Sequence, residues 1–144
     1  MKYMLLVHHD EESFRRRPEG ERQQMMQESV QLAQQLHANG QYLGAAPLHP
    51  SFETTCVRVR DGKPTVTDGP FAETREQLGG YFLVNAKDLD EAISIAARIP
   101  GARIGTVEIR PVTAVSGPAG RVRFVQISGF QYEQERDQCD SWCW

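Results

Sequence analysis

The apolar positions along the chain follow strand-like and helix-like periods that predict the order of its elements. Tyr3–Val7 is a short, nearly continuous apolar run, which is typical of a buried strand. A helical apolar stripe then runs from Met25 to Leu36. Pro18 occupies a position favoured at the start of that helix, and Asn39-Gly40 is a common helix stop. The first part of the chain therefore predicts a strand followed by a long helix.

The next segment predicts a short strand and a β-hairpin. Tyr42–Ala46 has the composition of a short strand. In Thr55–Arg60 apolar and polar residues alternate, which predicts a half-buried strand. Asp61-Gly62 fits a two-residue turn in which both positions need positive φ. The return strand is expected at Lys63–Thr67, on a sheet edge because Pro64 cannot donate a backbone hydrogen bond.

The second half predicts a loop, a strand, a helix and a final strand. The loop runs from Asp68 to Gly80, and Tyr81–Val84 after it is apolar on both faces. Asp88, followed by an acid three residues later, resembles a capping box at the start of a helix. We expect one face of that helix to consist of Leu89, Ala92, Ile93, Ala96 and Ile99. Ile104–Pro111 alternates again and predicts the last strand.

The resulting order is β-α-β, hairpin, β-α-β, which predicts an α+β, ferredoxin-like sandwich with its helices on one sheet face. The length of 144 residues fits one domain. Because Tyr81–Val84 needs cover on both faces and the helices supply only one, we expect a homodimer that buries the helix-free face.

Composition and charge narrow the classes of partner. The net charge of -3 lacks the basic footprint of a nucleic-acid-binding protein. Arg15–Arg17 lies among acids, so we interpret it as a solvated mixed-charge loop. The apolar start is too short for a signal peptide, and no segment has the length of a membrane span. Three cysteines do not suggest a disulfide framework. We therefore predict a cytoplasmic protein with no nucleic-acid or membrane partner.

The chain resembles the YCII-related, DGPF-motif proteins over about residues 1–112. The residues that carry the resemblance are Lys2–Leu6, Ala38–Gly40, Val57–Gly62 and, most specifically, Thr67–Tyr81 with its Asp-Gly-Pro-Phe motif. The resemblance implies a dimeric α+β barrel built from two ferredoxin-like units. Residues 113–144 depart from the family and are expected to form a C-terminal extension, with one more strand at Arg121–Ile127 and a terminal arm on a partner subunit.

The resemblance implies less about the activity of the protein than about its fold. The wider superfamily resembles small lyases and isomerases that act on ring-cleavage acids, some with a His-Asp pair. The matching positions here are Ser29 and Ala38, so that pair is not carried over. DGPF-motif relatives are also associated with extracytoplasmic-function sigma factors, which implies a regulatory context.

The Asp-Gly-Pro-Phe motif has a structural and a functional interpretation. Asp68 could accept a hydrogen bond from a backbone N–H two residues on, while Pro70 would push Gly69 into an extended conformation, giving a rigid strand exit. Alternatively, the turn directs the Asp68 carboxylate into a pocket with Phe71 as a wall, since so long a loop is often functional. Both interpretations stay open.

The other candidate residues are basic. His8 and His9 end the first strand, and because neighbouring strand residues face opposite sides they are not expected to hold one metal ion together. One of them could share a cavity with Asp68 and act as a base. Arg75 could bind a substrate carboxylate or pair with a neighbouring acid, and Arg58 is a further candidate ligand contact. No cofactor or metal motif is present in the sequence.

Three hypotheses follow for the function. In the first, the protein is a cofactor-independent lyase or isomerase for small organic acids, with Asp68 and His8 or His9 transferring the proton. In the second, the same cavity senses a metabolite without catalysis, as a ligand-binding or regulatory module. In the third, the loop motif only stabilises a structural dimer.

Overall fold

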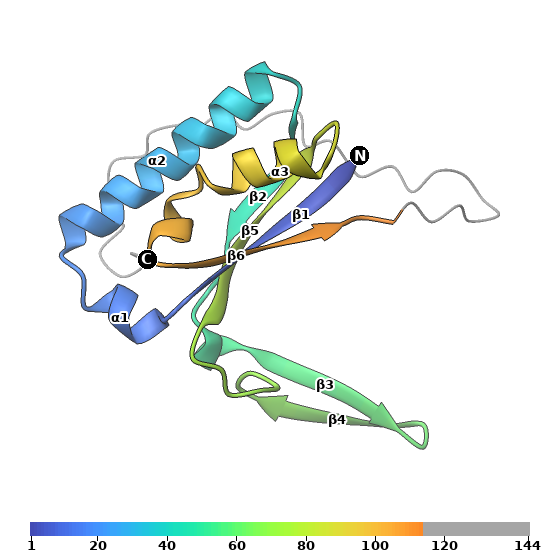
Figure 1. Ribbon diagram of the computed structural model, residues 1–144. Helices are drawn as coiled ribbons and strands as arrows, with labels where there is room; N and C mark the ends of the chain where they lie inside the picture. The colour runs from blue at the N-terminus through green and yellow to red at the C-terminus, as the bar shows by residue number, and fades with distance from the viewer. Residues whose placement is uncertain (114–144) are drawn as a thin grey trace, which may run out of the picture.

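The computed structural model describes residues 1–113 and contains six strands, three α-helices and two short 3-10 helices in that range (Figure 1). In chain order these are β1 (Lys2–His9), α1 (Glu11–Arg15), α2 (Glu19–Ala38), β2 (Tyr42–Pro47), η1 (Ser51–Glu53), β3 (Thr55–Arg60), β4 (Lys63–Asp68), β5 (Gln77–Asn85), α3 (Leu89–Ala96), η2 (Pro100–Arg103) and β6 (Gly105–Pro111).

Four of the strands form an antiparallel sheet in the order β2-β5-β1-β6. The first strand of the chain is central in it, between β5 and β6. Helices α2 and α3 lie together on one face of this sheet (Figure 1). Strands β3 and β4 pair only with each other and project from the end of the sheet where β1 finishes. The α+β class and the element order are as predicted and are consistent with a ferredoxin-like arrangement.

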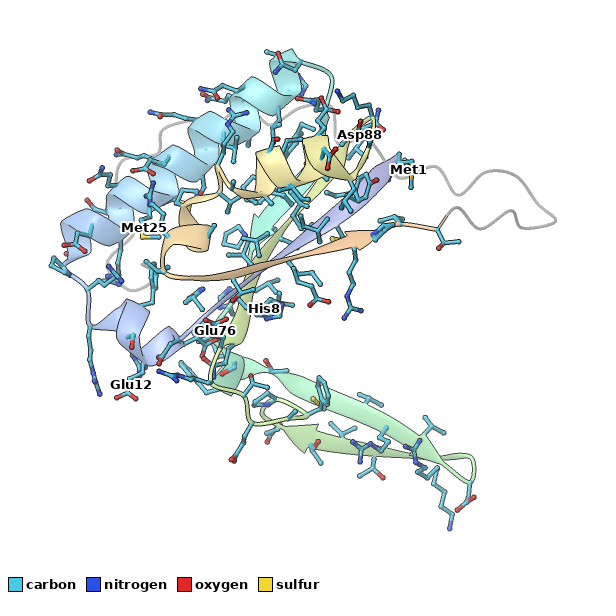
Figure 2. All side chains as sticks on the ribbon, in the orientation of Figure 1. Met1, His8, Glu12, Met25, Glu76 and Asp88 are labelled. Carbon is cyan, nitrogen blue, oxygen red and sulfur yellow. The ribbon has the colours of Figure 1, made fainter. Side chains whose placement is uncertain are left out.

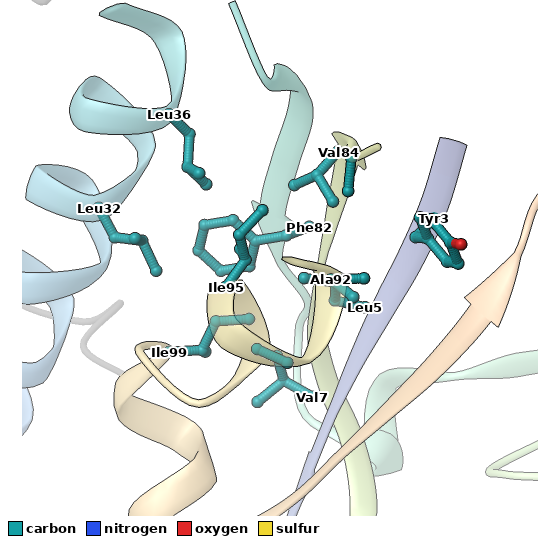
Figure 3. Close-up of a cluster of buried hydrophobic side chains, with 12 residues drawn as sticks. Tyr3, Leu5, Val7, Leu32, Leu36, Phe82, Val84, Ala92, Ile95 and Ile99 are labelled. Atoms are coloured by element: carbon teal, nitrogen blue, oxygen red, sulfur yellow. The ribbon is translucent and has the colours of Figure 1, made fainter. Parts of the chain in front are cut away.

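The hydrophobic core lies between the sheet and helices α2 and α3 (Figure 3). Alternate residues of β1 point toward the helices because side chains of a strand have a period of two. The core side chains are Tyr3, Leu5 and Val7 of β1, Phe82 and Val84 of β5, Leu32 and Leu36 of α2, and Ala92, Ile95 and Ala96 of α3, with Ala86 and Ile99 beside them. Strands β1 and β5 and helix α2 thus bury apolar residues of the faces that their patterns indicated, whereas α3 differs in part.

The exception is the set of residues that α3 buries. Leu89 and Ile93 were expected in the core, but each is about half exposed. The buried face instead passes through Ile95, which the sequence interpretation left out. The apolar side chains of this short helix form an arc that is wider than the face in contact with the sheet, so the pattern alone does not decide which part of the arc is buried.

The predicted helix and turn signals are confirmed. The Asp88 side chain accepts a hydrogen bond from the Glu91 backbone N–H at 2.9 Å. The Glu91 carboxylate accepts from the N–H of Lys87 at 2.6 Å, one residue earlier than in a standard capping box. At the hairpin turn, Asp61 and Gly62 have φ values of 50° and 73°, as the predicted turn requires.

The interpretation of Arg15–Arg17 as a loop was wrong for its first part. Glu11–Arg15 forms α1, and Arg16 caps its C-terminal end. Asp10 provides the N-cap, since its side chain accepts from the Ser13 N–H at 2.8 Å. An aspartate followed by two acids is a helix-start signal, so Asp10 and the acids after it indicate α1, whereas the basic run does not.

The prediction that Thr55–Arg60 is half buried was also wrong. The β3–β4 hairpin is exposed along almost its whole length. Its paired Val57 and Val66 are 66% and 62% exposed. The alternation correctly predicts a strand, but burial also requires a second surface, and nothing in the described part of the chain lies against this hairpin beyond its base (Figure 1).

Strand β5 begins earlier than expected, and the connection before it is shorter. The expected loop of Asp68–Gly80 is limited to residues 69–76, and Gly79-Gly80 lies inside the strand. Pairing with β1 shifts at this point, because Val7 pairs with Gly80 whereas the next residue, His8, pairs with Leu78. Gly79 is therefore the extra residue of a β-bulge, a feature common beside functional sites.

The expected C-terminal extension lies outside the described residues, apart from its first residue. This applies to the expected strand at Arg121–Ile127 and to the terminal arm.

We predict that Gly79→Ala destabilises the protein by about 1–3 kcal/mol, the usual cost of overpacking. A Cβ atom at Gly79 would lie 2.8 Å from Nδ1 of the buried His9 ring and closer still to its Cε1. Urea denaturation measures the change in the free energy of unfolding. Gly44→Ala in β2 is the matched control, since a Cβ atom there meets nothing within 4 Å. Equal stability of the two variants would contradict the proposed close contact.

Candidate functional site

An open pocket of about 910 Å³ lies where β1 ends, between α1, the loop before β5 and the start of β6. Most of the residues that line it carry a polar group in the side chain. The charged or titratable side chains in it are His8, Asp10, Arg17, Arg75, Glu76 and Glu108. Figure 2 shows His8 and Glu76 close together at this end of the sheet.

His8 belongs to the pocket because of its position in β1. It faces the helix-free side of the sheet, as do Leu6 and Met4, which lie two and four residues earlier in the strand. Its Nε2 atom is buried and has no hydrogen-bond partner among the described residues. That nitrogen lies 3.6 Å from a carboxylate oxygen of Glu108, within ion-pair range but beyond a hydrogen bond.

His9 faces the opposite side and is 5% exposed. Its ring lies 4.9 Å from the ring of Phe14 in α1, at a tilt of 56°. Burial lowers the pKa of His9 below its ordinary value, and the nearby charges of Glu11 and Asp10 only partly oppose this effect. His9 is therefore held in its neutral form in the folded protein and is absent from the pocket lining.

Helix α1 is anchored to the rest of the site by Glu11. Its backbone N–H donates to Oε1 of Gln77 at 3.2 Å. Its carboxylate accepts from the N–H of Ser51 at 2.8 Å and from the Oγ of the same residue at 2.7 Å. These bonds join α1, the start of β5 and the base of the hairpin, which fixes two walls of the pocket relative to each other.

The loop before β5 supplies Arg75 and Glu76 to the pocket. Thr74 Oγ1 donates to the Glu76 carbonyl at 2.7 Å, and the Gln77 side-chain amide donates to the Thr74 carbonyl at 2.5 Å. The backbone hydrogen bond from Ser13 is the largest cause of the lowered pKa of Asp10. The positive charge of Arg75 contributes a smaller effect in the same direction. The expected local pairing of Arg75 with Glu73 is not among the ion pairs of the described residues.

The Asp-Gly-Pro-Phe motif lies outside this pocket. Asp68 is the exposed last residue of β4, and Phe71 is 84% exposed. Arg58 lies on the exposed hairpin, away from the pocket lining. Of the sequence candidates, the structure thus brings together His8 and Arg75, and it does not bring Asp68 to them.

The conformation of the motif also differs from the expectation. Gly69 has a φ of +89°, a value that favours glycine, and is not in the ordinary extended region. The residue two positions after Asp68 is Pro70, which has no N–H to donate. The strand exit is instead held by Gly69, whose N–H donates to the Thr54 carbonyl at 2.7 Å and whose carbonyl accepts from Cys56 Sγ at 3.2 Å.

Sequence reasoning missed several of the pocket residues. Glu108 comes next to His8 only because β1 and β6 pair in a register that sets Thr106 opposite His8. Nothing in the sequence fixes that register across such a separation. Asp10 could have been found from its helix-capping pattern, as could the position of Arg17 just after α1.

Metal binding and membrane insertion are two further possibilities for residues 1–113. Within this range no three His, Cys, Asp or Glu side chains are grouped so that they could hold a metal ion. The helices of this range include none that is both long enough and apolar enough to cross a membrane.

A four-stranded antiparallel sheet with helices on one face and a pocket at the end of its central strand places the protein in the α+β class, and sequence comparison gives the family. The chain matches the YCII-related domain over residues 1–116. It is 32% identical over 114 residues to an uncharacterized protein of Rhizobium meliloti strain 1021, covering 78% of this chain and 92% of the relative. This chain therefore belongs to the YCII-related domain family.

We predict that protonation of His9 destabilises the fold. The pKa of His9 in the folded protein is below its value in the unfolded chain, so the unfolded chain binds the proton more tightly. The stabilising contribution of neutral His9 is complete above its ordinary pKa of 6.5 and is lost as the pH falls toward the folded value. The unfolding free energy, measured by urea denaturation from pH 7.5 to about 5, should therefore decrease less steeply for His9→Gln than for the wild type.

The control for this prediction is His37→Gln, because His37 is exposed on α2 and forms no ion pair among the described residues. That variant should keep the wild-type dependence on pH. An identical slope in His9→Gln and the wild type would show that His9 does not titrate with folding.

Proposed function

We propose that this protein binds a small organic acid in the pocket at the end of β1 and transfers a proton on it, as a cofactor-independent lyase or isomerase does. The observation that carries the proposal is the placement of His8. Its buried Nε2 lies 3.6 Å from the Glu108 carboxylate, and the same pocket contains the guanidinium of Arg75.

The imidazole of His8 is the proton-transfer group in this proposal. Imidazole is the side chain used most often as a general acid or base, and the neighbouring Glu108 carboxylate can orient the ring. With Nε2 directed at Glu108, Nδ1 is the nitrogen that a ligand would meet. The separation from Glu108 is longer than a hydrogen bond, but such distances commonly shorten when a ligand binds.

Arg75 is the carboxylate-binding group in this proposal. Its planar fork can donate two parallel hydrogen bonds to one carboxylate. Among the described residues its guanidinium forms no ion pair and no hydrogen bond, so binding a ligand would not require breaking an internal pair. Bringing an anion beside His8 would also favour the protonated ring after the proton is taken up.

The proposal gives proton transfer to His8 and not to Asp68 or His9. Asp68 is not among the lining residues of the pocket, and His9 is buried against Phe14 on the other side of the strand. Phe71 and Arg58 are likewise outside the pocket, so we give them no contact with the ligand.

A ligand-binding module without catalysis is the second candidate, and one observation favours it. The pocket is open, so the structure of one subunit does not exclude water from His8. Exclusion of water strengthens electrostatic catalysis, whereas ligand sensing does not require it.

We predict that the protein catalyses hydrogen exchange at the activated carbon of a bound acid, which is the hydrogen-bearing carbon beside the ketone in a 2-oxo acid and the carbon between the carboxylate and the double bond in a β,γ-unsaturated acid. Nuclear magnetic resonance in D₂O would follow deuterium incorporation for a panel of small 2-oxo and unsaturated acids. His8→Gln should abolish the exchange but preserve binding, and Arg75→Gln should weaken binding by 10-fold or more, since a charge-assisted pair contributes about 1.5–3 kcal/mol.

The control is His37→Gln, an exposed histidine of α2 away from the pocket. It should leave both exchange and binding unchanged. Arg75-dependent binding without exchange in the wild type would favour the ligand-binding module, and exchange that persists in His8→Gln would refute the role of His8.

We further propose that two copies of the chain pair through the helix-free face of the sheet, giving the dimeric α+β barrel expected for the family. On that face Met4 lies opposite Leu83, and Leu6 lies opposite Tyr81, across β1 and β5. At its β6 side it carries Glu108 and Arg110, whose opposite charges suit pairing of a surface with a copy of itself. Since His8 points to the same face, a second copy would also cover the open pocket.

We predict a dimer at micromolar concentration in sedimentation velocity. Leu6→Glu should convert it to monomers, because a charge at the centre of an apolar interface is left without solvent or a partner. Ile93→Glu is the control, since this residue is 48% exposed on the helical side and should leave the dimer intact. A monomeric wild type would refute the proposed assembly.

A further inference from the structure

The lining of the pocket indicates the chemical class of its ligand. Ile104 is the one apolar residue among the described residues that line it. Hydroxyl groups, carboxylates, guanidinium groups and an imidazole make up the rest. A ligand that matched this lining would carry polar or charged groups opposite these side chains, because polar groups buried against apolar ligand atoms lose hydrogen bonds to water.

Several of the charged groups already have a protein partner. Glu108 accepts a hydrogen bond from Arg110 at 2.5 Å. Asp10 is occupied as the N-cap of α1. Arg17 lies 3.5 Å from Glu21 at the edge of the pocket. These groups contribute to the local potential, but a ligand would have to compete with their existing contacts.

Arg75 and Glu76 are the charged groups that remain. Among the described residues, neither side chain forms an ion pair or a hydrogen bond, and the two do not pair with each other. Both line the pocket, and the hydrogen bonds of Thr74 and Gln77 described above hold the backbone around them. The loop therefore presents one positive and one negative group side by side, at a fixed place.

We propose that the ligand is a small zwitterion, with a carboxylate that binds Arg75 and an amino group that binds Glu76. This inference depends on the proposed function in one respect, which is the binding of a carboxylate by Arg75. A ligand with two negative charges would be repelled by the three carboxylates of the pocket, Asp10, Glu76 and Glu108. A purely cationic ligand would leave Arg75 without a counter-charge.

Glu76 is then the residue that determines specificity. It distinguishes an amino acid from the same acid without its amino group, since only the former can satisfy both charges. Arg75 makes no such distinction, because both compounds carry the carboxylate. The two side chains thus have separable effects on affinity.

Matched pairs of small acids test this inference by isothermal titration calorimetry at low salt. The pairs are alanine with propionate, β-alanine with propionate, and 4-aminobutyrate with butyrate. At least one amino compound should bind the wild type 10-fold or more tightly than its partner acid. Glu76→Gln should remove that preference and leave the affinity for the partner acid unchanged or higher, whereas Arg75→Gln should weaken both compounds.

The matched control is Glu73→Gln, because Glu73 is an exposed acid of the same loop that is not among the pocket-lining residues. It should keep the wild-type preference, and circular dichroism should show the same fold in all variants. If the simple acids bind as tightly as the amino compounds and Glu76→Gln changes nothing, the zwitterion is refuted while Arg75-dependent acid binding stands. If neither series binds, both the zwitterion and the proposed function are refuted.

Discussion

The close approach of three strands at the end of β1 is the constraint on which the site depends. Glycines flank this point on both sides, Gly79 in β5 and Gly105 in β6. A Cβ atom at Gly105 would lie 2.9 Å from the Cα of His9, and one at Gly79 would meet the ring of the same residue. The absence of both side chains lets the neighbouring strands close around the end of β1 while the His9 ring enters the core.

This arrangement separates two consecutive histidines by environment. His9 is buried against Phe14, where desolvation lowers its pKa and keeps it neutral. His8 emerges on the other face beside the Glu108 carboxylate, in a pocket with charged neighbours. The alternation of a single strand thus gives one imidazole a structural place and the other the surroundings of an acid–base group. The proposed activity rests on the second.

Local patterns predicted the elements well, and the errors have identifiable physical causes. The long helix, the hairpin turn and the cap at Asp88 follow from short-range signals and are present. The expected burial of Val57 failed because alternation indicates a strand but says nothing of what packs on it. The expected burial of Ile93 was wrong because the apolar arc of α3 is wider than the face in contact with the sheet. The expected extended conformation of Gly69 was wrong because a glycine can adopt positive φ at little cost, even before proline.

The sequence by itself determined the α+β class, the order of the elements, the family and the opposite orientation of His8 and His9, since all of these depend on residues close together in the chain. Only the tertiary structure decided which histidine meets a pocket and which carboxylate lies beside it. Glu108 reaches His8 through the register of two strands about a hundred residues apart, which is set by packing of the whole sheet and not by any local signal. Only the tertiary structure shows the position of Asp68 as well. Its motif is the most conspicuous in the sequence, but Asp68 lies at the exposed end of β4, outside the pocket.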